Sequence, residues 1–157
     1  VGGLVGANGD PDTSLTSGGP ISLCYAVGDV TGDQFVGGLV GWNEGGAVDL
    51  CYASGSVVGR NFLGGLVGTN GHPNATGDTG GPITSCYATG SVAAAGDYAG
   101  GLVGFNRIAL IRTCYARGSV SCSGQHAGGL VAYNDDYMPT AWGDFRVFGT
   151  KTVVAFW

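Results

Sequence analysis

Charged side chains are scarce in this chain of 157 residues. They make up 11% of the sequence, against about 25% in a typical soluble domain. Lysine occurs once, as Lys151, and the six Lys and Arg residues are outnumbered by 11 Asp and Glu, which gives a net charge of −5. A nucleic-acid-binding protein needs a basic face. We therefore expect no nucleic-acid partner.

Long apolar runs are missing as well. No run of about 18 apolar residues is free of glycine, so we expect no membrane span. No complete repeat unit offers a helical pattern of about 10 residues, because the 33 glycines interrupt the units too often. No signal peptide is visible, and the sequence starts inside a repeat, which fits either a processed product or a segment of a longer protein.

Three short phrases recur in a fixed order instead. Cys-Tyr-Ala occurs four times and is followed each time by Gly-x-Val, while Gly-Gly-Leu-Val occurs five times, at Gly2, Gly37, Gly64, Gly100 and Gly128. Successive starts of Gly-Gly-Leu-Val are 35, 27, 36 and 28 residues apart. The longer spacings contain an insertion, at 9–20 and 71–82. Repetition at this period indicates stacked units.

The period predicts an all-β fold. Three strand-length phrases in about 27 residues fit a right-handed β-solenoid of about five rungs, in which each strand pairs with its copy one turn away, about 4.8 Å along the axis. The insertions then become loops on alternate rungs. We expect residues 1–134 to form the solenoid and residues 135–157, which do not match the repeat, to form an aromatic-rich C-terminal extension or cap.

Equivalent residues of such a coil form columns along its axis. In Cys-Tyr-Ala, Cys and Ala share one strand face and the Tyr points to the other, so we expect buried thiols and an outward column of Tyr25, Tyr52, Tyr87 and Tyr115. Parallel Cβ vectors disfavour disulfides between stacked cysteines, and the spacing does not match a zinc site. An in-register asparagine after each Gly-Gly-Leu-Val can form a hydrogen-bonded ladder; these residues are Asn8, Asn43, Asn70, Asn106 and Asn134.

Gly-Gly-Leu-Val also suggests an interaction surface. Leu and Val are neighbours, so in a strand they point to opposite sides. The residue two positions after Val varies between copies, which suggests that it and the Val face outward. The predicted surface therefore comprises Val5, Val40, Val67, Val103 and Val131 beside Trp42, Phe105 and Tyr133, with the C-terminal Trp142, Phe145, Phe148, Phe156 and Trp157. Either the chain's own tail covers these valines, or another molecule contacts them.

The pattern Gly-Gly-Leu-Val-Gly-x-Asn followed by Ile-x-x-Cys-Tyr-Ala-x-Gly-x-Val resembles the GLUG repeat. That repeat is found in large secreted or surface-attached bacterial proteins, including some IgA-specific metallopeptidases and adhesin-like proteins. The resemblance covers roughly residues 1–134, with Ala132 in the place that glycine holds in the other copies. It implies an extracellular or cell-surface location. It implies no activity, because the His-Glu-x-x-His zinc motif of the peptidases is absent from the sequence.

The residues leave three functions open. We expect a structural subunit that self-associates, end to end or by strand addition, into a filament or surface layer. The second is a stalk or adhesin segment that binds a protein or glycan of a host. The third is a polysaccharide-active enzyme, for which paired carboxylates such as Asp10 or Asp12 with Asp78 would be needed. Asp beside Pro and Gly is ordinary turn chemistry, so we expect no enzyme, catalytic residue, metal or cofactor.

Overall fold

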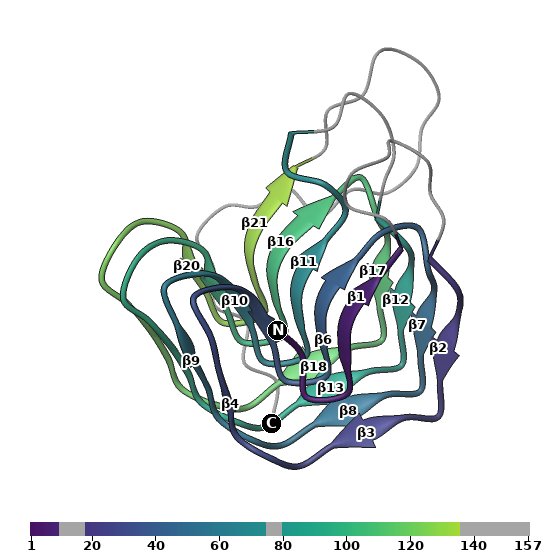
Figure 1. Cartoon of the computed structure of the whole chain (residues 1–157), viewed down its shortest axis with the longest axis horizontal. Coiled ribbons are helices and arrows are strands. Elements are labelled where there is room, and N and C mark those ends of the chain that lie inside the picture. The colour runs from purple at the N-terminus through teal and green to yellow at the C-terminus, as the bar shows by residue number, and fades with distance from the viewer. Residues whose placement is uncertain (10–17, 75–79, 136–157) are drawn as a thin grey trace.

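The computed structural model describes residues 1–9, 18–74 and 80–135. These residues form 21 strands and no helix, so none of them provides a helix able to cross a membrane. The chain winds as a coil, and strands of successive turns lie above one another (Figure 1). The predicted aromatic extension lies outside the described residues except for Asp135, and so do Asp10, Asp12 and Asp78.

The strands form five parallel sheets, and each strand pairs with its counterpart one turn away. The central sheet holds β1 (Val5–Asn8), β6 (Val40–Asn43), β11 (Val67–Asn70), β16 (Val103–Arg107) and β21 (Val131–Asp135). The side sheet holds β2 (Ile21–Ser22), β7 (Val48–Asp49), β12 (Ile83–Thr84) and β17 (Ile111–Arg112). The tyrosine sheet holds β3 (Tyr25–Ala26), β8 (Tyr52–Ala53), β13 (Tyr87–Ala88) and β18 (Tyr115–Ala116).

Two further sheets complete the turn. The outer sheet holds β4 (Val30–Thr31), β9 (Val57–Gly59), β14 (Val92–Ala94) and β19 (Val120–Cys122). The groove sheet holds β5 (Gln34–Gly37), β10 (Asn61–Gly64), β15 (Ala99–Gly100) and β20 (Ala127–Gly128). Like residues pair in every sheet: Val67 is in register with Val40 and Val103, and Tyr87 with Tyr52 and Tyr115. The predicted β-solenoid is confirmed.

Each turn contains five short strands rather than the predicted three, because two of the recurring phrases bend. The chain turns at Gly38 and Leu39, so that Gly-Gly-Leu-Val ends β5 and begins β6. A second corner separates β7 from β8, where Leu50 has a φ of 52°. The strands are only two to five residues long. The alternation of inward and outward side chains therefore holds within a strand but not across a corner.

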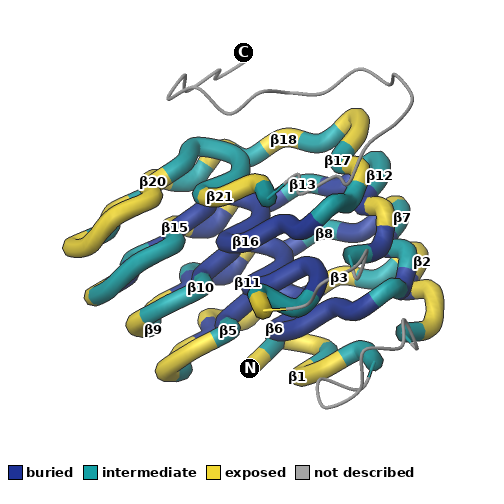
Figure 2. The backbone as a smooth tube through the Cα atoms, turned by 90° about the horizontal axis from the view of Figure 1, so that it is seen from above, coloured by how far each residue is buried: buried dark blue, intermediate teal, exposed yellow. Residues whose placement is uncertain are grey.

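Two apolar cores fill the coil. The first lies between the central, side and tyrosine sheets and includes Leu39, Val48 and Cys51. The second lies between the outer and groove sheets and includes Val36, Val57 and Leu63. Burial is greatest in the middle turns, along β6, β11 and β16 (Figure 2). The Cys and Ala of Cys-Tyr-Ala face the first core, as predicted.

The predicted outward column of valines is wrong in its orientation. Val40, Val67 and Val103 are fully buried members of the first core, and Val5 and Val131, at the two ends of the column, pack against it. The bend explains the error: the amides of Leu39 and Val40 both donate to the carbonyl oxygen of Leu66. Because the backbone turns between the two residues, both side chains point inward.

The predicted asparagine ladder stands at the corner after the central sheet. Asn43 Nδ2 donates to Oδ1 of Asn70 at 2.8 Å, and it also donates to the carbonyl of Gly46 in its own turn at 2.7 Å. Asn70 repeats both bonds, to Asn106 and to Gly81. Gly81 lies near the end of the insertion at 71–82, so the same amide closes corners with and without an inserted loop. This is why the repeat accepts insertions there.

Candidate functional site: an aromatic groove

One column of rings projects outward from the groove sheet. Phe35, Phe62, Tyr98 and His126 occupy the same position in successive turns, two residues before each of the last four copies of Gly-Gly-Leu-Val. Successive centroids are 5.0, 4.7 and 4.7 Å apart, and the planes are within 17° of parallel. Their neighbours in the sequence, such as Val36 and Leu63, point into the second core. We call these four residues the first column.

The backbone is strained at every member of the first column. The φ angles are 53° at Phe35, 58° at Phe62, 64° at Tyr98 and 63° at His126. Side chains with a Cβ pay about 1–2 kcal/mol for this left-handed conformation, and it is rare for bulky residues. The corner before each cysteine has the same geometry, for example at Leu23 and Leu50. The corners of the repeat impose the strain, and at this corner the side chain is a ring in every turn.

A second column faces the first from the central sheet. It contains Trp42, Phe105 and Tyr133, which are in register with Ala7 and Thr69. Rings meet edge to face across the groove, with centroids 4.7 Å apart for Phe35 and Trp42 and 5.7 Å apart for Tyr98 and Tyr133. Trp42 and Phe105 are buried by these contacts. The three predicted aromatic residues thus face away from the core, and the two columns line a groove.

One turn of the coil matches the model of a known protein family. Residues 36–58 match the model described as the GLUG motif. The chain carries a GLUG motif. The matched span runs from Val36 in β5 to Val58 in β9, which is one turn of the coil, and neighbouring turns repeat its phrases in the same register. The predicted resemblance is confirmed. Comparison with curated proteins and with solved structures gives no match.

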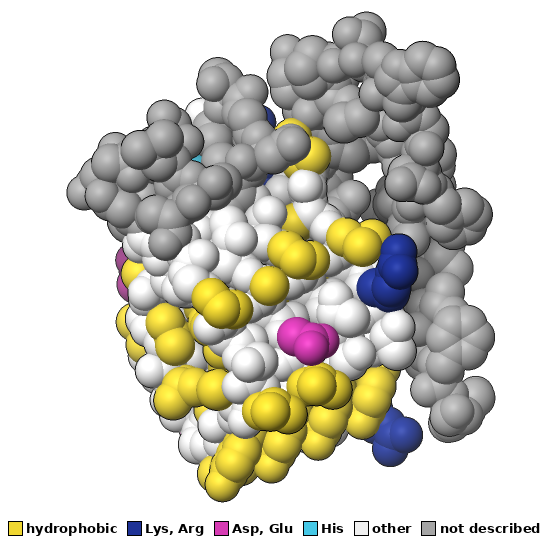
Figure 3. All heavy atoms as spheres, turned by 90° about the vertical axis from the view of Figure 1, so that its right-hand side faces the viewer, with side chains coloured by type: hydrophobic (Ala, Val, Ile, Leu, Met, Phe, Trp, Pro, Cys, Tyr) yellow, Lys and Arg dark blue, Asp and Glu magenta, His cyan; other side chains and the backbone are white. Residues whose placement is uncertain are grey.

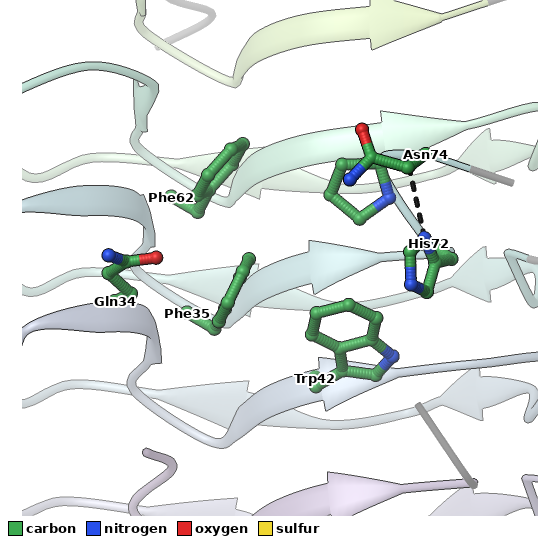
Figure 4. Close-up of a pocket in the computed structure, with 7 residues that line it drawn as sticks. Gln34, Phe35, Trp42, Phe62, His72 and Asn74 are labelled. Carbon is green, nitrogen blue, oxygen red and sulfur yellow. Dashed lines mark hydrogen bonds between the residues drawn. The ribbon is translucent and has the colours of Figure 1, made fainter. Parts of the chain in front are cut away.

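The second column lacks a ring in the turn that contains β11. Thr69 stands there between Trp42 and Phe105. A cavity of about 430 Å³ is lined by Gln34, Phe35, Trp42, Phe62, His72, Pro73 and Asn74. In Figure 4 Trp42 lies on one side of the cavity, Phe35 and Phe62 on a second, and His72 and Asn74 on a third. Thr69 is fully buried and is not part of this lining, and its hydroxyl has no hydrogen-bond partner.

The polar groups around the cavity are mostly neutral. Gln34 and Asn74 supply side-chain amides, and the backbone N–H of Asn74 donates to Nδ1 of His72 at 3.0 Å. The indole N–H of Trp42 points toward Oε2 of Glu44 at 3.4 Å, and the Glu44 side chain is fully buried. Among the described residues no group of three or more His, Cys, Asp and Glu could hold a metal ion. The arrangement suits binding of a neutral molecule.

A separate exposed surface lies on the tyrosine sheet. Tyr25, Tyr52, Tyr87 and Tyr115 stack with centroids 4.9–5.1 Å apart and planes within 6° of parallel, so the predicted outward column is confirmed. Leu23 and Leu50 are exposed at the adjoining corner. We call these six residues the tyrosine face. Figure 3 faces the neighbouring side sheet and shows hydrophobic side chains gathered in rows there and along the lower edge of the view.

All five cysteines have free thiols. The four that stack lie against the first core, and each thiol bonds to a backbone carbonyl two residues earlier, as Cys86 does to Thr84 at 3.0 Å. A hydrogen bond with the Cys86 side chain lowers the pKa of Cys114 to about 7. The same bond and burial raise the pKa of Cys86, and burial raises that of Cys51.

Sequence reasoning missed the first column. A signal was present, because a ring stands two residues before each of the last four copies of Gly-Gly-Leu-Val. The residue types differ, as two Phe, one Tyr and one His, so a search for identical phrases passes over them. The cavity had no such signal in the sequence. It depends on which strands of two different sheets lie side by side, and only the structure shows this.

Proposed function

We propose that this chain is a non-enzymatic structural protein of the cell exterior, a β-solenoid subunit that self-associates through its tyrosine face. The exposed, stacked tyrosine column carries the proposal. Tyr25 and Tyr115 keep 59% and 43% of their surface accessible, and Leu23 keeps 77%. Contiguous apolar surface of this kind usually marks an interaction site. Because the valines are buried, this face takes the place of the contact surface expected from the sequence.

A second copy of the chain is the partner that fits best. The tyrosine face repeats at 4.9–5.1 Å along the axis, and an identical face has the same spacing, so rings of two copies can interdigitate along their whole length. A two-fold symmetric pairing of like patches is the commonest way in which subunits join. Stacked sheets pack about 10 Å apart in this way.

The charges beside the tyrosine face favour an antiparallel pairing. The outward positions of the side sheet are, turn by turn, Ser22, Asp49, Thr84 and Arg112. Arg117 lies at the same end as Arg112, with its guanidinium 5.4 Å from the ring centre of Tyr115. Acidic and basic side chains are therefore separated along the face (Figure 3). In an antiparallel pair, Asp49 of one copy lies toward the Arg112 end of the other copy, so that opposite charges approach each other.

Light scattering after size exclusion at micromolar concentrations tests the proposal. Wild type should be an oligomer, and the double variant Tyr52→Lys, Tyr87→Lys should be a monomer with an unchanged circular dichroism spectrum. Val58→Lys is the control, since Val58 is exposed on β9, away from the tyrosine face. A monomeric wild type would overturn the proposal. Assembly that survives in the tyrosine variant but is lost on removal of residues 142–157 would instead assign the contact to the C-terminal segment.

A further inference from the structure

We propose that the cavity lined by Trp42, Phe35 and His72 binds one pyranose ring of a neutral glycan. The cavity lies in the groove between the groove sheet and the central sheet, whereas the tyrosine face lies on a different sheet. Binding here is therefore independent of the proposed self-association, and one can be present without the other.

The first argument is the place and size of the cavity. It lies between Phe35 and Phe62 of the first column and Trp42 of the second column, with His72 and Asn74 on the remaining side (Figure 4). A volume of about 430 Å³ is within the range of about 300–1,000 Å³ found for small-molecule sites.

The second argument is the chemistry of the lining. Trp42, Phe35, Phe62 and Pro73 supply apolar and aromatic surface, while the amides of Gln34 and Asn74 supply both donors and acceptors. A pyranose has the matching character: its C–H bonds form apolar patches that pack on aromatic rings, and its hydroxyls project from the rim, where amides can bond them. A wholly apolar ring would leave the two amides unpaired when bound, which costs free energy.

The third argument is charge. None of the seven lining residues is acidic, and none is Lys or Arg. The buried Glu44 lies at the indole N–H of Trp42, and the chain as a whole carries −5. A sulfated or uronic-acid sugar would add a further negative charge at a site whose lining has no Lys or Arg to pair with it. A neutral hexose meets no such penalty.

Direct titration of the full chain, produced without glycosylation at Asn74, tests the proposal. The probes are methyl β-glucopyranoside, methyl β-galactopyranoside and N-acetylglucosamine, with phenylalaninamide as the aromatic competitor and glucuronic acid as the anionic one. Chemical shifts of isotope-labelled Trp and His side chains report binding at Trp42 and His72. We expect saturable, millimolar binding of at least one neutral sugar, with little or no shift from glucuronic acid.

Two variants locate the site. Gln34→Ala with Asn74→Ala should weaken sugar binding by about tenfold, since two hydrogen bonds are lost. Gln125→Ala is the matched control, because Gln125 precedes His126 as Gln34 precedes Phe35, in a turn outside the cavity. No saturable sugar binding, equal binding by the Gln34 and Asn74 double variant, or binding of phenylalaninamide alone would each overturn the proposal.

Discussion

Asn43 donates a hydrogen bond of 2.8 Å to Asn70, its counterpart one turn along the coil. Asn70 passes the same bond to Asn106, also at 2.8 Å, and both residues are buried. A single amide thus joins two turns and closes the corner of its own turn. The ladder is a buried polar network in which each member satisfies the next, and such networks are costly to break.

Asn70→Ala should destabilise the chain by about 2–4 kcal/mol, because the amide of Asn43, the carbonyl of Gly81 and the Oδ1 of Asn106 each lose a partner in a buried site. Asn134→Ala is the control, since Asn134 is exposed at the end of the ladder and accepts one bond from Asn106. Urea unfolding measured by circular dichroism gives both free energies of unfolding. Equal losses for the two variants would contradict the ladder's role.

Gly64→Ala should abolish folding or cost more than about 4 kcal/mol. A Cβ at residue 64 would lie 1.9 Å from the carbonyl oxygen of Val67, and backbone cannot move away without breaking the turn. Gly28→Ala is the matched test, because a Cβ there has no atom within 4 Å and should change stability by less than about 1 kcal/mol. Thermal unfolding followed by circular dichroism distinguishes them, and a folded Gly64→Ala protein of wild-type stability would refute the close packing.

The tyrosine column should lose stability at alkaline pH. Desolvation within the stack, followed by the like charges of ionised Tyr115 and Tyr52, raises the pKa of Tyr87 above its ordinary value of 10.0. As the pH rises, the Tyr87 hydroxyl therefore loses its proton in the unfolded chain before it does so in the folded chain. The contribution of Tyr87 to the free energy of unfolding is complete below pH 10 and is lost as the pH passes through the raised pKa. Ultraviolet titration at 295 nm should show late ionisation, and Tyr87→Phe should remove that component. An ordinary titration in wild type would contradict this.

Cys114 should be the most reactive of the stacked cysteines that have shifted pKa values. Its pKa of about 7, set by the hydrogen bond with Cys86, makes it largely a thiolate at pH 8, and thiolates are the nucleophilic form. Cys51 and Cys86 are buried and their pKa values are raised. Iodoacetamide at pH 8 with peptide mass mapping should label Cys114 well before those two. The rate should fall as the pH drops below 7, and faster labelling of Cys86 would contradict the assignment.

Several parts of the architecture were predictable because repetition itself carries the information. Recurrence of Cys-Tyr-Ala and Gly-Gly-Leu-Val required like residues to stack, and the columns of Tyr52 and Asn43 followed from that. The orientation of Val40 was not predictable from alternation, since the chain bends one residue before it. The cavity was not predictable either, because it is formed by Gln34 and Trp42 of one turn with Phe62 and His72 of the next.

The sequence by itself determined the period, the register and the residues that form columns, because copies of one phrase adopt one conformation and pair with each other. Only the tertiary structure decided where the coil turns its corners, and therefore which side chains face the core and which face the groove. The reason is physical: corners at residues such as Phe35 and Leu50 adopt left-handed backbone angles that neither side chain favours, so hydrogen bonds between turns, and not local preference, hold them there.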